Sequence, residues 1–193
     1  PRSGQAPTSG RGRSLFPWTL FKAALSSHKA LDQTVKARRK TLAKALEVDP
    51  ASEKKAEDEA LARLEQACEA IDDSSASKLT TLVSELKAIG VGARSDTRVV
   101  IFSERIATLD WLAETVPAAL KLKPKNISVL HGGMADVKQM DVIEEFGLAD
   151  SPIRILFTGD MASEGVNLHR QCHHLIHFDL PWSLITIEQR NGR

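Results

Sequence analysis

The spacing of apolar residues along the chain changes character near Asp96. Beyond that point, short runs of β-branched and aromatic residues alternate with amphipathic stretches. The short runs predict buried strands at 98–103, 127–131, 153–158 and 173–180. The amphipathic stretches predict helices at 107–121, 136–148 and 183–193. Strands that alternate with helices in this way are typical of β-α units, so we expect an α/β fold with a parallel sheet flanked by helices.

Between residues 15 and 90 the apolar residues recur at helical spacing instead. Two series of them each fall on one helix face: Leu31, Val35, Leu42 and Leu46, and then Ala60, Leu61, Leu64, Cys68 and Ile71. Asp49 and Pro50 are predicted to separate the two helices, because Asp is a good N-cap residue and Pro suits the first helical position. We therefore expect a hairpin of antiparallel helices, followed by a third helix from Lys78 to Ile89 that ends at Gly90.

The first 14 residues are rich in Gly, Pro, Ser and Arg and show no apolar periodicity, which predicts a flexible tail. "GRGRS" in this tail resembles a phosphate-binding loop only superficially, because it lacks the GK[ST] ending and follows no predicted strand. We expect three parts: a tail at 1–14, a helical segment at 15–95 and an α/β domain at 96–193.

Charge is distributed unevenly along the chain. The net charge of the 193 residues is +1, so the overall balance indicates no particular partner. Residues 1–50 nevertheless carry ten Lys and Arg against three Asp and Glu, a balance of +7. The positive residues are densest at Lys36, Arg38, Arg39, Lys40 and Lys44. This basic segment is interpreted either as a nucleic-acid contact or as a solvated helix face.

The remaining bulk features indicate a cytoplasmic protein. The two cysteines, Cys68 and Cys172, form no disulfide framework and are expected to be small buried residues in a reducing compartment. No run of 18 or more apolar residues and no signal peptide is present, so we expect no contact with a membrane.

Unusual residues follow each of the four predicted strands. Ligands of parallel sheets bind at the carboxyl ends of the strands, so these loops are the candidate site. They are "SER" at 103–105, "HGGM" at 131–134, "TGDMASEGVNL" at 158–168 and "DLPW" at 179–182, the last leading into a basic helix.

The order "VVIFSER", "LHGGM", "ILFTGDMASEGVNL", "FDLPW" and "EQRNGR" resembles the second RecA-like lobe of a superfamily 2 helicase or translocase. Within that group it is most similar to the Swi/Snf-type ATPases, particularly the bacterial RapA-like branch. The resemblance is strong over 96–193. It is weak over 20–95, where "LSSHKAL" and "SSASKLTTLVSEL" resemble the helical segment that leads into the lobe. It implies a RecA-like helicase C-terminal lobe preceded by helices.

The resemblance also implies a nucleotide site shared between two lobes. In such motors the first lobe holds ATP and Mg²⁺ with a Gly-rich loop, a Lys and a metal-binding carboxylate. This sequence has no GxxxxGK[ST] and no DExH or DEAD string, so we expect the first RecA-like lobe as a partner. The resemblance places Gly165, Asn167 and Gln189 beside the nucleotide. The alternative for Gly165 is a turn between a strand and a helix.

Two arginines of "EQRNGR" are the catalytic candidates. The resemblance makes Arg193 an arginine finger that stabilises charge on the γ-phosphate. Arg190 is the second candidate, with a role in supporting the motif itself or the lobe interface. An ordinary positive helix end is the alternative for both. The family pattern continues to a further arginine, so we expect the chain to be a fragment that is cut within this motif.

The resemblance places Ser103, Glu104, His131 and Gly132 on a nucleic-acid-binding face, where hydroxyl and backbone N–H groups suit phosphate contacts. It also assigns Thr158, Gly159 and Asp160 to the nucleic-acid backbone or to its coupling with ATP. Plain helix caps and turns are the alternative for these loops.

His169, Cys172, His173, His174 and His177 lie within nine residues. We expect no metal there, because His173 and His174 point to opposite faces of a strand and paired ligand spacings are missing. Trp182 is interpreted as a packing residue, with a base-stacking platform as the alternative.

These features predict a fragment of an ATP-dependent translocase that acts on nucleic acid, duplex DNA in the first instance, and remodels bound proteins. A strand-separating helicase of DNA or RNA is the alternative within this class. A stand-alone module with a degenerate RecA-like lobe, which binds nucleic acid or a protein such as RNA polymerase, is the alternative outside it. We expect the fragment alone to be inactive.

Overall fold

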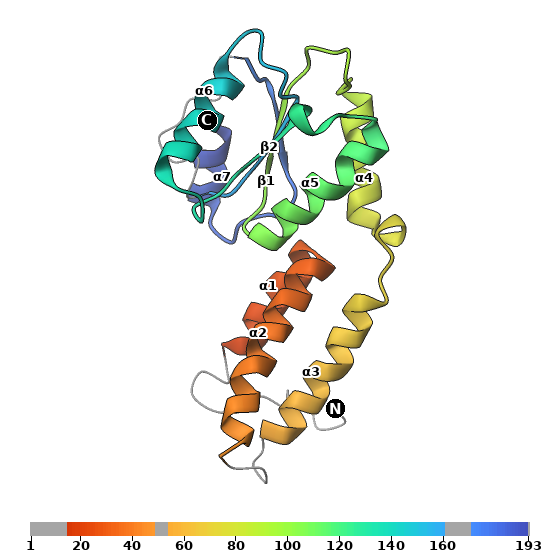
Figure 1. The fold of residues 1–193 in the computed structure, drawn as a ribbon, viewed down its shortest axis with the longest axis vertical. Coiled ribbons are helices and arrows are strands. Elements are labelled where there is room, and N and C mark those ends of the chain that lie inside the picture. The colour runs from red at the N-terminus through yellow and green to blue at the C-terminus, as the bar shows by residue number, and fades with distance from the viewer. Residues whose placement is uncertain (1–14, 49–53, 161–170, 193) are drawn as a thin grey trace. The chain divides into compact units, whose positions relative to one another are not determined.

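The computed structural model describes residues 15–48, 54–160 and 171–192. The chain divides into two compact units, Pro1–Asp72 and Asp73–Arg193. The first unit is helical, and the second contains the sheet (Figure 1). The predicted tail at 1–14 and the predicted turn at Asp49 and Pro50 lie outside the described residues.

The first unit consists of α1 (Phe16–Ser26), α2 (His28–Leu46) and α3 (Lys54–Glu69). Ser27 separates α1 from α2 because its backbone is extended, and its Oγ accepts a hydrogen bond from the Ala30 N–H at 3.0 Å. The predicted hairpin is present, since α2 and α3 lie side by side (Figure 1). Apolar residues of the three helices form its core: Val35, Leu42 and Leu61, with Phe16, Leu20, Leu31 and Leu64 packed against them.

Arginines of α2 are joined to acidic residues of α3. The Arg38 guanidinium donates to the Glu57 carboxylate twice, from Nε to Oε1 at 2.8 Å and from Nη2 to Oε2 at 3.1 Å. Glu57 is only 1% exposed. Arg39 binds Asp58 at 2.9 Å and Glu65 at 2.5 Å. These bidentate and bridging pairs hold the two helices in register.

Lys36 lies among three carboxylates, those of Asp32, Glu65 and Glu69. Its Nζ is 2.8 Å, 3.8 Å and 3.2 Å from them, respectively. The carboxylates lie within 4.8 Å of one another, a spacing that suits a bound cation, and the Lys36 ammonium supplies that positive charge. Asp32, and then Glu69, raise the pKa of Lys36.

The basic stretch of α2 is therefore divided. Lys36, Arg38 and Arg39 face acidic partners, whereas Lys40 and Lys44 are exposed. Only Lys40 and Lys44 keep both interpretations made from the sequence, a nucleic-acid contact or a solvated helix face.

The second unit contains a parallel sheet of four strands in the order β2-β3-β1-β4. Its strands are β1 (Val99–Phe102), β2 (Ile127–Leu130), β3 (Ile155–Thr158) and β4 (His174–His177). Its α-helices are α4 (Ser77–Ala88), α5 (Ile106–Leu120), α6 (Asp136–Gly147) and α7 (Leu184–Asn191), and short 3₁₀ turns lie at Asp73–Ser75 and Pro124–Asn126. The strands and helices predicted from the sequence are all present, and the expected fold class is confirmed.

Alternate residues of the central strands face opposite layers. Val99 and Ile101 point into a core shared with α4 and α5, and Val100 and Phe102 point into a second core shared with α6. Figure 1 shows α4 and α5 on one side of the sheet and α6 and α7 on the other. β1 is buried along its whole length because both of its faces are covered, as its continuous apolar run predicts.

The boundary between the units lies earlier than the one expected at residue 95. Leu79, Leu82 and Leu86 of α4 pack into the core of the sheet, so this helix belongs to the second unit. The Trp111 indole Nε1 of α5 donates to Asp73 Oδ1 at 2.9 Å, which ties the start of the unit to α5. The amphipathic pattern of α4 predicts a buried face, but it does not identify the surface that covers it.

Both cysteines are free and buried, as expected. Burial raises the pKa of the Cys172 thiol, which lies in the α6 core. Among the described residues, no helix combines the length and the apolar character that a membrane span requires.

We predict that Glu57→Gln lowers the free energy of unfolding of the helical unit by about 3 kcal/mol, because Arg38 then loses a charged partner in a buried setting. Urea unfolding followed by far-UV circular dichroism measures this change. Glu69→Gln is the matched control. Its side chain is 58% exposed, so we expect a loss of at most about 0.5 kcal/mol. Equal effects of the two substitutions would contradict the importance of the Arg38–Glu57 pair.

Candidate functional site at the carboxyl ends of the strands

Three strands bring their carboxyl ends together. Phe102 of β1 lies opposite Thr158 of β3 and His177 of β4. The backbone pairing continues one residue further, since the Ser103 N–H donates to the Thr158 carbonyl at 3.1 Å and the Phe178 N–H donates to the Phe102 carbonyl at 2.9 Å. The polar residues that follow each strand therefore lie side by side, as expected for parallel strands.

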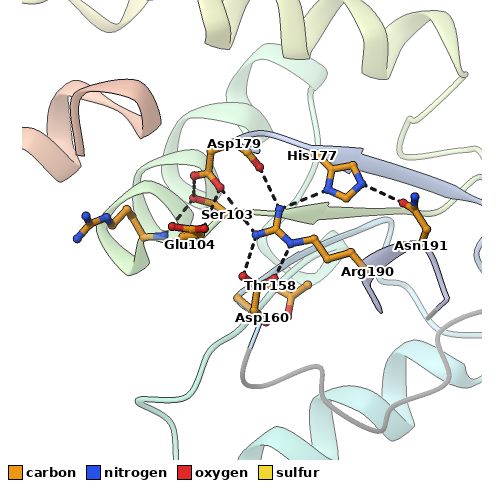
Figure 2. Close-up of polar contacts among 10 residues, drawn as sticks. Ser103, Glu104, Thr158, Asp160, His177, Asp179, Arg190 and Asn191 are labelled. Atoms are coloured by element: carbon orange, nitrogen blue, oxygen red, sulfur yellow. Dashed lines mark hydrogen bonds and ion pairs between the residues drawn. The ribbon is translucent and has the colours of Figure 1, made fainter. Parts of the chain in front are cut away.

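Arg190 of α7 is the centre of this polar group (Figure 2). Arg190 is 1% exposed as a whole residue, so its guanidinium is shielded from water. The guanidinium makes a bidentate pair with Asp160, which follows β3: Nε lies 2.5 Å from Oδ1 and Nη2 lies 2.9 Å from Oδ2. A buried arginine is stable only when such partners satisfy its charge and its N–H groups.

The third nitrogen of Arg190 binds residues of β4 and its following loop. Nη1 donates to the Asp179 carbonyl at 2.9 Å and lies 3.3 Å from His177 Nδ1. The guanidinium carbon lies 5.3 Å from the centre of the Phe102 ring. Because all three nitrogens are engaged in this arrangement, Arg190 is suited to hold the motif together. A contact with phosphate would require it to leave Asp160.

The contacts of His177 indicate its tautomer. Nδ1 faces an Arg190 N–H, so it acts as an acceptor, and Nε2 then carries the hydrogen and donates to Asn191 Oδ1 at 3.0 Å. The ring stacks on Phe102, with centroids 6.2 Å apart. His177 thus links the end of β4 to the last turn of α7.

Asp179 joins the loop after β1 to the same group. Its Oδ2 accepts from the Ser103 hydroxyl at 2.6 Å, and its Oδ1 accepts from the Glu104 N–H at 3.0 Å. Oδ1 also lies 4.0 Å from Arg190 Nη2. One carboxylate therefore connects the loop before α5 with the arginine of α7 (Figure 2).

The structure brings together only part of the residues singled out from the sequence. Ser103, Glu104, Asp160 and Arg190 belong to one network. Thr158 is buried beside it, and its hydroxyl donates to the Gly159 carbonyl at 3.1 Å.

Among the described residues, the other candidates are not joined to this network by a hydrogen bond or an ion pair, and the rest lie outside those residues. His131 and Gly132 follow the edge strand β2, where the Gly133 N–H donates to His131 Nδ1 at 3.1 Å. Gln189 is exposed on α7. Gly165, Asn167 and Arg193 lie outside the described residues, and so does His169 of the histidine group.

Sequence reasoning gave no role to His177, Asp179 and Asn191, all of which contact the network. The signal for Asp179 was its position directly after a strand, inside "FDLPW". His177 was considered only for a metal site, because its neighbours His173 and His174 suggested one. Both of those neighbours are exposed.

Trp182 does not occupy the buried position expected of a packing residue. Its side chain is 59% exposed, whereas Pro181 before it is buried. Three other large apolar residues of the same segment are also exposed: Leu180 at 70%, Leu184 at 77% and Ile185 at 66%. The start of α7 therefore presents an apolar surface beside the network.

We predict that Arg190→Lys lowers the free energy of unfolding of the sheet unit by about 2–5 kcal/mol. A lysine cannot reproduce the planar fork, so Asp160, His177 and the Asp179 carbonyl lose donors in a buried site. Chemical unfolding of the chain measures the loss. Gln189→Ala, an exposed change on the same helix, is the control and should alter stability by less than about 0.5 kcal/mol. A similarly small effect of Arg190→Lys would contradict the arrangement described.

The chain is similar to known proteins. Residues 77–193 match the family described as helicase conserved C-terminal domain. The chain is 30% identical over 141 residues to an uncharacterized ATP-dependent helicase of Bacillus subtilis, YqhH, a match that covers 67% of this chain and 23% of that protein. The chain thus spans about a quarter of the length of this relative.

Solved structures agree with the fold. A crystal structure of the C-terminal part of the Fun30 ATPase domain matches with a TM-score of 0.53 and 21% identity, covering 87% of this chain and 65% of that one. The Pyrococcus furiosus Hef helicase domain matches with a TM-score of 0.53 and 14% identity, covering 94% and 35%. These likenesses show a RecA-like architecture, and the family match spans the whole sheet unit from α4 onward. The chain therefore belongs to the helicase C-terminal domain family.

Proposed function

We propose that this chain is the second lobe of an ATP-dependent motor that moves along nucleic acid, duplex DNA in the first instance. It acts with a first RecA-like lobe that binds ATP. The observation that carries the proposal is the Arg190 network, which joins the loops after β1, β3 and β4 to α7 in a member of this family. Such a connection suits a lobe that couples nucleic-acid binding to ATP hydrolysis.

The residues of the chain fit only part of a nucleotide site. The sequence contains no GxxxxGK[ST] loop and no DExH or DEAD string. Among the described residues of α7, Gln189 is exposed and Arg190 is held by Asp160. ATP and Mg²⁺ would therefore be held by the first lobe, where a Lys and the metal neutralise the phosphates. The chain alone is expected to bind nucleotide weakly and to hydrolyse none.

The nucleic-acid contacts are proposed for the loops at the carboxyl ends of the strands. The Ser103 hydroxyl and the Glu104 N–H are donors that suit a phosphate oxygen. The Gly132–Gly133 loop after β2 exposes further backbone in the same role. Contacts of this kind fix the position of the lobe on a duplex without reading its sequence.

The apolar surface at the start of α7 is proposed to contact the first lobe. Leu180, Trp182, Leu184 and Ile185 are each at least 59% exposed, and exposed apolar groups of this size mark protein interfaces. The "FDLPW" and "EQRNGR" motifs support a Swi/Snf-type, RapA-like assignment, with a DNA-bound protein such as RNA polymerase as the object of remodelling.

The finger hypothesis concerns Arg193. In the protein that joins this chain to its ATP-binding lobe, we predict that Arg193→Ala lowers ATP turnover at least about a hundredfold, because an arginine finger is worth about 10³–10⁵ in related chemistry. Arg193→Lys should not restore turnover, since a point charge cannot reproduce the bidentate fork. ATP affinity should change little, because the effect belongs to the transition state.

Steady-state ATPase assays, beside a nucleotide-binding titration, test this prediction. Arg94→Ala removes the same positive charge from an exposed position before β1, and it is the control that should retain turnover. Near-normal turnover of Arg193→Ala would exclude the finger role. Loss of ATP binding together with turnover would instead assign Arg193 to ground-state affinity.

A further inference from the structure

Asp179 holds the two donors that the proposed function assigns to nucleic acid. Its carboxylate accepts from the Ser103 hydroxyl at 2.6 Å and from the Glu104 N–H at 3.0 Å. A phosphate oxygen that approached these donors would compete with the carboxylate for the same two hydrogens. Since both groups are anionic, they would also repel each other at this distance.

Among the described residues, Arg190 supplies a positive charge in ion-pair range that can receive a displaced Asp179 carboxylate. Its Nη2 lies 4.0 Å from Asp179 Oδ1, which is ion-pair range but beyond a hydrogen bond. A small shift of the carboxylate away from Ser103 would bring the two groups into hydrogen-bond contact. Lys78, whose ammonium lies 4.1 Å from the centre of the Phe178 ring, adds positive charge on the α4 side of the same segment.

Arg190 cannot respond alone, because its guanidinium is also bound bidentately to Asp160 and it belongs to α7. If Arg190 bound the Asp179 carboxylate more closely, its guanidinium would move toward Asp179 and its hydrogen bonds to Asp160 would weaken. The helix would then shift with it, together with the exposed Gln189 that precedes Arg190. The side chain of Arg190 is 2% exposed and that of Asp179 is 10% exposed, so bulk water cannot replace these contacts freely.

We propose that Asp179 is a positioning residue that transmits phosphate contact at Ser103 and Glu104 to α7. Without nucleic acid it occupies the phosphate donors, and with nucleic acid it releases them and turns toward Arg190. This proposal rests on the proposed function, because it takes the Ser103–Glu104 loop as a nucleic-acid contact. It adds the residue through which phosphate binding at that loop would change the position of α7, the helix that carries the catalytic candidates.

The test combines binding with a local readout of α7 in the 193-residue chain. A short mixed-sequence DNA duplex is titrated by fluorescence anisotropy at fixed low salt. Hydrogen exchange of the α7 amides is then compared with and without saturating duplex. The variants are Asp179→Asn and the control Asp96→Asn, which removes the same charge at the opposite end of β1, where the side chain is fully exposed.

We expect Asp179→Asn to bind the duplex about threefold to tenfold more tightly, because a competing anion at contact distance has been removed. The change in α7 exchange on binding should be present in the unaltered chain and in Asp96→Asn but lost in Asp179→Asn. A merely structural role for Asp179 would predict weaker binding and faster exchange with or without duplex. Binding by Asp179→Asn alone would also support the proposal, since it would show that Asp179 blocks the donors.

The other outcomes separate the two hypotheses. Equal affinities with the same α7 response would overturn the role of Asp179 and leave the nucleic-acid contact standing. No binding by any variant would overturn both. If Asp179→Asn does not fold, Ser103→Ala serves instead. It removes one of the two shared donors, so the α7 response to duplex should weaken, and an unchanged response would refute the proposal.

Discussion

The candidate site depends on one buried positive charge, the guanidinium of Arg190. A charge withdrawn from water must be balanced by charges and acceptors that are held close to it. Asp160, His177 and the Asp179 carbonyl provide them, each from a different position at the end of a strand. The contacts of Arg190 therefore fix α7 against the strand ends, and they also hold the loops after β3 and β4 next to each other.

The parallel sheet makes this arrangement possible. β3, β1 and β4 are neighbours in register, so the residues after them emerge at one edge although they are far apart in the sequence. Both faces of β1 are buried under helices, so apolar packing supports the strand from two sides. Ser103 and Asp179 are 76 residues apart in sequence and yet share a hydrogen bond. A lobe of this kind can place several polar groups around a ligand at one edge of its sheet.

Local sequence patterns were sufficient to predict the helices and strands. The contacts between residues that are distant in the sequence were not predictable from these patterns. The apolar runs predicted the strands, and the motifs after them predicted where the polar residues meet. The packing of α4 against the sheet was not predictable, because an amphipathic face does not identify the surface that it contacts. The arginines of α2 were expected to be part of a positive surface, yet Arg38 is matched by Glu57 on a separate helix. Likewise, "EQR" at a helix end does not predict that Arg190 is buried. Its burial depends on the carboxylate of Asp160, which follows β3 and is distant in sequence.

Asp160 and Arg190 act as one unit that holds α7 to the strand ends. A double-mutant cycle with Asp160→Asn and Arg190→Gln, measured by urea unfolding of the sheet unit, tests it most directly. We expect a coupling free energy of about 2 kcal/mol or more, because each single change leaves the other group unpaired in a buried site. A coupling below about 0.5 kcal/mol, the range of independent sites, would contradict it.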